Sequence, residues 1–514
     1  MGSAAPCGGV GQPTFARATA AATVTLRAVK IRVPPRLRRT LAASFVLPVL
    51  AGCASGLFGR LGPDYAPASA PAAAWHAPLP DARPHAGSPR RLAAWWAQFN
   101  DAALDSLIAA AQAHSATLAQ AAAAIERSRA DAIAAGVAGA PNLDAIASAN
   151  RAAFTFGGPV AIRTQTQIGL QSSWEIDLFG SLARQRESVQ ARLDANVATW
   201  HDARVSLAAE VANAYLNYRY CEIQVVQADA DARSRAATAA MTEAAGKAGF
   251  QSRATVALAQ SSAAESAAAL SQRRGQCDIS IKGLVALTAL EEPALRALLA
   301  KQRASKLPEP QQFRIDAIPA RVVAQRPDVA AAERRVAAAS ADIGHAEADR
   351  YPRLTLSGSI TPTRIAVAPA PTLSLTTWSI GPSLVLPLLD GGRRSANVDA
   401  YRAQYAAAES VYREKVRVAV REVEEAMVRL DSAASREADT ATGARGYRAN
   451  VEAAQARLKS GLGSAMELED ARRLSLASDA TVVALAQERV GAWIALYRAV
   501  GGGWEPESPQ RTTP

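Results

Sequence analysis

The sequence predicts an α+β membrane protein made mostly of long α-helices and duplicated internally. Three observations support this fold class. One pattern of residues recurs after about 212 positions, which is the mark of a duplicated unit. Short segments alternate apolar and polar residues, as half-buried strands do. Very long stretches lack Pro and are rich in Ala, Arg, Glu and Gln, as long helices are.

The two copies of the pattern run in the same order along the chain. The spacing is 211 in the upstream part and 212 further on, so one register shift separates them. Matched pairs are Leu143 and Leu354, Gly180 and Gly392, Glu210 and Glu422, and Gly249 and Gly461. Each copy is expected to form a helix, a strand pair, a very long helix, a turn and a helix. The predicted repeats span 93–304 and 315–504, between an N-terminal segment 53–92 and a flexible tail 505–514.

Alternating segments in both copies predict strands with one apolar face. In residues 166–179, apolar residues alternate with polar ones, and residues 376–389 repeat the pattern less cleanly. The apolar positions are Ile168, Leu170, Trp174, Ile176 and Leu178, and then Trp378, Ile380, Leu384, Leu386 and Leu388. Strands of about ten residues with this alternation suit a membrane barrel that has lipid outside and water inside. A soluble, half-buried hairpin is the alternative.

The stretches after Gly180 and Gly392 predict the two very long helices. Their bulky apolar residues recur at spacings of three and four, which is a helical period. Each helix would contain about 67 residues and measure roughly 100 Å. The apolar stripes are narrow, and much alanine on the remaining faces permits close packing on both sides, as a ring of helices requires. An ordinary coiled-coil spacer is the alternative.

A secretory signal and a lipid-attachment site precede the first repeat. Residues 32–40 are rich in Arg, and residues 41–52 form an uncharged apolar run too short to span a bilayer as a helix. Cys53 follows Leu50, Ala51 and Gly52, which resembles a bacterial lipobox. We therefore expect residues 1–52, an extension and signal peptide, to be removed and Cys53 to be acylated. This covalent lipid is the only cofactor that the sequence predicts.

Composition argues against nucleic-acid binding and against catalysis. The formal net charge is +11, but residues 1–52 hold seven basic residues and no acidic one, which leaves 50 basic against 46 acidic residues in the remainder. A nucleic-acid surface needs clustered positive charge and aromatic residues for stacking, and the sequence has neither pattern. The five His residues lack metal-ligand spacing, and no nucleophile motif accompanies them. We expect a protein that is not an enzyme and holds no metal.

The remaining cysteines predict a disulfide. Cys221 lies 28 residues before Gly249, and Cys277 lies 28 residues after it. In an antiparallel helical hairpin that turns at this glycine, the two residues would be neighbours, and an exported protein is exposed to oxidising conditions. Two independent buried thiols are the alternative.

Several motifs together resemble the TolC-like outer membrane factors, in particular the RND-type outer-membrane efflux lipoproteins of the NodT/OprM kind. They are the lipobox, LGPDYAP (61–67), WWAQFNDAALDSLI (95–108), WEIDLFG (174–180), RPDVAAAE (326–333), LLDGGRR (388–394) and GGGW (501–504). The resemblance implies a homotrimer in which each protomer gives four strands to a twelve-stranded barrel in the outer membrane and its helices to a periplasmic helical barrel. It also implies that residues 291–321, expected to be irregular, belong to an equatorial belt.

The resemblance further implies a periplasmic gate and a docking site. Met466 and Asp470 match the family's apolar residue and carboxylate at the narrow end of the tunnel, and a spacing of four places them on one helix face. Pairing of Asp470 with Arg472 or Arg473 is the alternative. The tips at Gly249, Phe250, Gln251 and Ser252 and at Gly461, Leu462, Gly463 and Ser464 match the sites where the periplasmic adaptor docks. Simple turn chemistry is the alternative there.

The function implied is the outer-membrane channel of a tripartite efflux system. Such a channel exports drugs or other small toxic compounds with a periplasmic adaptor and an inner-membrane RND pump, and it is anchored in outer membrane lipid. Two alternatives stay open. One is the outer-membrane duct of a type I secretion system, and the other is a structural lipoprotein that spans the periplasm.

Overall fold

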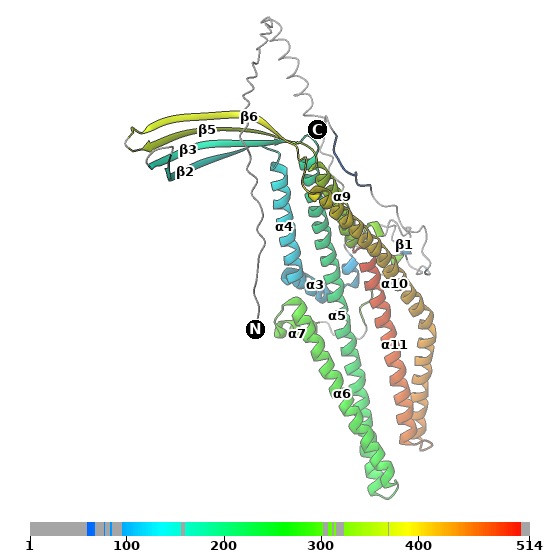
Figure 1. The fold of residues 1–514 in the computed structure, drawn as a ribbon. Helices are drawn as coiled ribbons and strands as arrows, with labels where there is room; N and C mark the ends of the chain where they lie inside the picture. Colours follow the sequence, from blue (N-terminus) through cyan, green and yellow to red (C-terminus); the bar gives the residue numbers. More distant parts are fainter. Residues whose placement is uncertain are drawn as a thin grey trace, which may run out of the picture. The chain divides into compact units, whose positions relative to one another are not determined.

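A computed structural model describes residues 59–66, 77, 83–84, 95–155, 160–301, 307–310, 313–314, 323–368 and 370–504. These residues form long helices and a four-stranded antiparallel sheet (Figure 1). The predominantly helical α+β class predicted from the sequence is therefore correct. Cys53, the signal segment and the tail 505–514 lie outside the described residues.

In the first half of the chain, a short 3-10 helix is followed by two α-helices, a strand pair and three further helices. The order is η1 (Trp95–Phe99), α3 (Ala102–His114), α4 (Ala116–Val137), β2 (Asn142–Phe154), β3 (Ala161–Ile176), α5 (Ser181–Lys247), α6 (Arg253–Thr288) and α7 (Glu292–Ala300). Helix α3 starts after Asp101, whose carboxylate accepts hydrogen bonds from the backbone N–H groups of Ala103 and Leu104.

The second half presents a similar order of elements. It contains α9 (Pro327–Ala348), β5 (Arg353–Val367), β6 (Leu373–Val385), α10 (Arg393–Lys459) and α11 (Ala465–Ala499). A two-residue strand in each half, β1 (Arg83–Pro84) and β4 (Phe313–Arg314), forms a small parallel pair. In both halves, a strand pair is followed by a very long helix that turns back on a shorter one.

Helices α5 and α10 each contain 67 residues, as the sequence predicted. At 1.5 Å per residue, each measures roughly 100 Å. An aspartate fixes the start of each helix by accepting hydrogen bonds from backbone N–H groups of its first residues: Asp177 bonds Ala183, and Asp390 bonds Arg394. The charge and hydrogen bond of Arg394 also hold the pKa of the Asp390 carboxyl below its ordinary value.

The sheet has the strand order β2-β3-β5-β6 and is antiparallel throughout. Strand β3 from the first half pairs with β5 from the second, so the sheet joins the two halves. Strands β2 and β6 are the edges, and each has one side that pairs with no other strand of the described residues. Such an open edge is a site for pairing with another chain.

The strands end earlier than the alternating pattern suggested. Strand β3 stops at Ile176, and β6 stops at Val385. Leu178, Leu386 and Leu388 therefore belong to the connections that lead into α5 and α10, not to the strands. The partner strand β5 begins at Arg353, so residues beyond Ile176 and Val385 find no paired residue opposite them.

The main hydrophobic core lies where α3, α5, α10 and α11 meet. The Trp95 ring stacks on Tyr497 of α11 with 4.7 Å between ring centroids. Buried Arg326 pairs with Glu422 of α10 at 2.7 Å and donates to the backbone carbonyl of Ala499, at the end of α11. The RPDVAAAE motif thus caps one helix and ties three helices together.

Residues 292–300 correct the expectation of an irregular segment. They form α7, an amphipathic helix with Pro293 in its first turn, where the missing N–H costs nothing. Leu295 and Leu299 on one face of α7 are buried. The carbonyl of Leu299 accepts hydrogen bonds from the buried guanidinium of Arg219 in α5.

Candidate functional site

The two helical hairpins, α5–α6 and α10–α11, turn at the ends of the helices remote from the sheet (Figure 1). The first turn has Gly249 at φ +80°, a conformation that favours glycine. Phe250 follows and is 82% exposed, and the Ser252 hydroxyl caps α6 by accepting from the Thr255 N–H at 3.1 Å. The first predicted tip is therefore a tight turn with one apolar side chain in the solvent.

The second tip repeats this arrangement. Gly461 has φ +69°, and Leu462 is 75% exposed. Ser464 and Glu467 form a capping box at the start of α11, in which each side chain bonds the other's backbone N–H. Equivalent positions of the two tips thus present Phe250 and Leu462, two exposed apolar residues.

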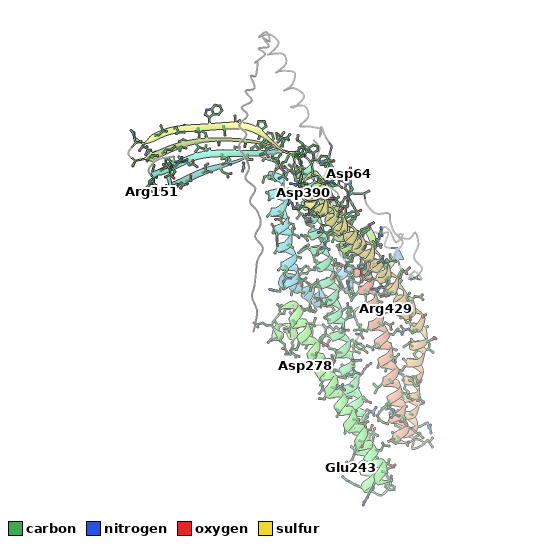
Figure 2. The ribbon with its side chains drawn as sticks, in the orientation of Figure 1. Asp64, Arg151, Glu243, Asp278, Asp390 and Arg429 are labelled. Carbon is green, nitrogen blue, oxygen red and sulfur yellow. A yellow bond between two sulfur atoms is a disulfide. The ribbon has the colours of Figure 1, made fainter. Side chains whose placement is uncertain are left out.

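An ion pair lies near each of the two tips. Near the first turn, Glu243 accepts a hydrogen bond from Lys247, which holds the pKa of the Glu243 carboxyl below its ordinary value (Figure 2). Near the second turn, Arg457 lies 3.5 Å from the Glu467 carboxylate. These pairs are exposed, so each contributes little to stability.

Met466 and Asp470 lie on the first turns of α11. Met466 is half-buried, and Asp470 is exposed with its carboxylate 2.7 Å from Arg473. Both residues line a recess of about 170 Å³ between α5, α6 and α11. The single chain thus contains the Asp470–Arg473 pair, which was one of the two interpretations of Asp470. Both predicted gate residues lie on one side of α11.

A buried polar link beside this recess was not found from the sequence. Glu469 of α11 is buried and accepts a hydrogen bond from the Thr238 hydroxyl of α5 at 3.0 Å. Arg235 of α5 lies 3.7 Å from the same carboxylate and donates to Asp231 and to Ser262. The link therefore holds the two hairpins together near their tips.

The sheet has one apolar and one polar face. The strand registers bring alternate residues of all four strands to the same face. The apolar face carries Leu143, Ala145, Ala147, Ile168, Leu170, Trp174, Ile176, Leu354, Leu356, Ile360, Trp378, Ile380 and Leu384. Trp378 is 73% exposed, and Ile380 is similarly exposed. The opposite face carries mainly Ser, Thr and Gln.

Cys221 and Cys277, the pair predicted from the spacing, are joined by a disulfide in the structure. Their Cα atoms are 5.6 Å apart, within the range that bridging requires. The bond connects α5 to α6 in the half of the hairpin away from the tip. It ties the first hairpin together, and α10 and α11 contain no Cys.

The N-terminal residues 59–66 lie against the start of α5 and along α9, where Pro63 contacts Ser340 and Gly62 contacts Gly344. The guanidinium of Arg184 is buried and donates to the carbonyls of Leu61 and Gly62, and it pairs with Asp64 at 2.7 Å. The Leu61 N–H donates to the carbonyl of Phe179. The segment that follows the predicted lipid site is thus held at the junction between the sheet and α5.

In the part of the chain that the structure describes, no group of three or more His, Cys, Asp or Glu residues is placed to hold a metal ion. Among these described helices, none has the length and apolarity needed to cross a membrane.

Two long helical hairpins attached to a sheet with an exposed apolar face are the architecture of an outer-membrane channel protein. The chain belongs to the outer membrane efflux protein family, whose model matches residues 107–290 and 318–502. It is 31% identical over 473 residues to nodulation protein T of Rhizobium leguminosarum bv. viciae, which covers 90% of this chain and 93% of the relative.

Two further proteins support this assignment. The outer membrane protein OprJ of Pseudomonas aeruginosa is 29% identical over 374 residues, or 71% of this chain and 77% of OprJ. The solved structure of the outer-membrane channel OprN superposes with a TM-score of 0.76 at 26% identity and covers 87% of this chain and 100% of OprN. The protein is therefore a relative of outer-membrane efflux channels.

Proposed function

We propose that the protein is the outer-membrane duct of a tripartite RND-type efflux system. As a homotrimer, it would export drugs or other small toxic compounds that an inner-membrane pump delivers through a periplasmic adaptor. The observation that carries this proposal is the sheet, which combines an exposed apolar face with two unpaired edges, β2 and β6.

Trimer formation would remove both edges. If β6 of one copy pairs with β2 of the next, three copies close twelve strands into a barrel. The apolar face would then contact lipid, and the face rich in Ser, Thr and Gln would line a water-filled channel. Because a closed barrel would place the apolar face toward lipid and the polar face toward water, we prefer a membrane barrel to a soluble hairpin.

The helices support the same assembly if the chain is an internal duplication. Within one copy, α5 of the first half packs against α9 of the second. In the duplicated order, the equivalent pair is α10 with α4, which make no substantial contact among the described residues. Ile133 and Val137, in the last turns of α4, are exposed. The α10 helix of one copy would therefore pack on α4 of the next.

The gate of the duct would lie at Met466 and Asp470. Three copies of each side chain around the axis would form an apolar ring and a ring of carboxylates one helical turn away. Three carboxylates in one constriction repel one another and attract cations. The nearby Asp470–Arg473 pair would reduce this repulsion in the closed state.

The two tips would receive the adaptor. Phe250 and Leu462 are exposed apolar side chains on tight turns, and the neighbouring small residues leave room for another helical tip. Gly249, Gln251, Ser252, Gly461, Gly463 and Ser464 complete the proposed docking surface.

Acylation of Cys53 would anchor the duct in the membrane. Cys53 is six residues before Gly59, so an extended linker would reach at most about 21 Å. Because Arg184 holds residues 61–64 at the base of the sheet, the acyl chains would enter the membrane beside the barrel. A Cys53→Ser variant should fail to incorporate labelled palmitate; incorporation that continued in this variant would exclude Cys53 as the acylated residue.

A deletion experiment in the source bacterium tests the function. Loss of the gene should raise accumulation of a fluorescent efflux substrate, and a plasmid-borne copy should restore export. If dye accumulation is unchanged and secretion of a protein is lost, the type I secretion duct replaces this proposal. If dye accumulation and protein secretion are both unchanged while the cell envelope weakens, the structural lipoprotein replaces this proposal.

A further inference from the structure

Two arginines interrupt the apolar face of the sheet at its far end. Arg151 of β2 and Arg364 of β5 are both exposed. Arg151 lies opposite Thr164, and Arg364 lies opposite Thr166. Thr164 and Thr166 are two positions apart on β3, so both arginines share the face of Ile168 and Leu170. Strand spacings place their Cα atoms roughly 12 Å apart, so the two guanidinium groups can contact the same ligand.

This end of the face is hollowed. A recess of about 490 Å³ contains Arg364, and its residues on the same face are Thr166, Ile168, Pro362, Ser374 and Thr376. Three hydroxyls and a guanidinium therefore lie next to an apolar patch. The recess matches a ligand that has a charged, hydroxyl-rich head and an apolar tail.

The depth of the arginines places them at a membrane surface. Arg364 is ten residues along β5 from Leu354, where the apolar face begins. With the usual strand tilt of about 40°, ten residues rise about 25 Å, which is the height of a barrel's apolar band. Arg151 lies one row further on, at the sheet end remote from the helices (Figure 2). An arginine facing lipid is tolerated at this level but costly near the bilayer centre.

We propose that Arg151, Arg364 and the adjoining recess bind the phosphorylated headgroup of a glycolipid in the outer leaflet. This inference rests on the proposed barrel, because the helices then occupy the periplasm and the far end of the sheet faces outward. The outer leaflet of an outer membrane consists of glycolipids with phosphates on a sugar head. The forked guanidinium groups bind phosphate oxygens in pairs, the three hydroxyls bond the sugar, and Ile168 and Pro362 contact the first methylenes of the acyl chains.

Lipid binding to the detergent-purified trimer tests the proposal. Native mass spectrometry would compare bisphosphorylated lipid A with its dephosphorylated form, on the wild-type protein and on an Arg151→Gln/Arg364→Gln variant. The phosphorylated lipid should bind the wild type at least about tenfold more tightly than the dephosphorylated lipid. The variant should lose this preference. Arg163→Gln is the matched control, because Arg163 is on the polar face of the same sheet end and should leave binding unchanged.

The outcomes separate this inference from the function on which it rests. Conductance of the same preparations in phosphatidylcholine bilayers reports the duct and needs no glycolipid. Conducting trimers that bind both lipids equally, or whose preference survives in the glutamine variant, would overturn the inference alone. If the glutamine variant does not fold, the comparison of the two lipids on the wild type still decides. An Arg151→Lys/Arg364→Lys variant should keep part of the preference, because the charge remains and the fork is lost.

Discussion

Glu469 of α11 accepts a hydrogen bond from the Thr238 hydroxyl of α5 at 3.0 Å, although 231 positions separate them in the chain. Both side chains are buried, and the carboxylate also lies 3.7 Å from Arg235. A buried carboxylate needs such partners, because water does not reach it. The link therefore favours the arrangement in which the α10–α11 hairpin packs against α5 near the proposed gate.

Replacement of Thr238 by Val should loosen this link. The carboxylate of Glu469 would lose its hydroxyl donor, and we expect a stability loss of about 1–3 kcal/mol and a higher conductance in planar bilayers. Thr242→Val is the matched control, since the Thr242 hydroxyl bonds only the carbonyl of Thr238 in its own helix. Equal conductance of the Thr238 variant and the wild type would show that the link does not restrain the duct.

Removal of the proposed gate should open the channel. A Met466→Ala/Asp470→Ala variant lacks both the apolar ring and the carboxylate ring, so the ion conductance of purified trimers should rise and cation preference should fall. Asp479→Ala, which breaks a pair with Arg448 further along α11, serves as the control. Unchanged conductance in the gate variant would place the constriction elsewhere.

Loss of the disulfide should destabilise the first hairpin. The Cys221–Cys277 bond closes a 56-residue separation, and removing such a bond costs about 2–4 kcal/mol. A Cys221→Ser/Cys277→Ser variant should therefore unfold at lower denaturant concentration than the oxidised wild type. Added reductant should lower the wild-type midpoint and leave that of the variant unchanged. If reductant left the wild-type denaturant midpoint unchanged, the result would contradict the presence of the disulfide.

The Asp328 carboxyl should make the free energy of unfolding depend on pH in the acid range. Burial alone would raise the pKa of its carboxyl, but the hydrogen bonds and charge of Arg326 outweigh this and lower it. A depressed folded pKa gives stability that is present above the unfolded pKa, about 4, and is lost as the pH falls through the folded value. The stability advantage of wild type over Asp328→Asn should therefore shrink below about pH 4.

Denaturant titrations between pH 7 and pH 3 measure this advantage. The control is Asp278→Asn, because Asp278 forms an exposed pair with Arg296 and should contribute little at any pH. A constant difference between wild type and Asp328→Asn across this range would contradict the assignment.

Local patterns predicted the elements of this fold well. The long helices, the strand pairs and the tips at Gly249 and Gly461 follow from composition, periodicity and turn residues within short windows. The positions of Cys221 and Cys277 relative to one turn also sufficed to predict their contact. In each case the relevant information lies within one hairpin.

Contacts between hairpins could not be predicted in this way. Glu469 lies between the two predicted gate residues in the sequence, but its partners are on α5. Nothing in the spacing of residues 466–470 indicates which side chain points inward. The clamp of Arg184 on residues 61–64 is similarly long-range. The end of β3 at Ile176 was missed because Leu178 continues the alternation beyond the last paired residue.

Negative-stain imaging of the detergent-purified mature protein tests the central claim most directly. The proposed duct predicts particles with threefold symmetry and a helical section of roughly 100 Å, set by the 67 residues of α5 and α10. Thin single rods or compact particles without threefold symmetry would contradict the duct and favour a structural lipoprotein.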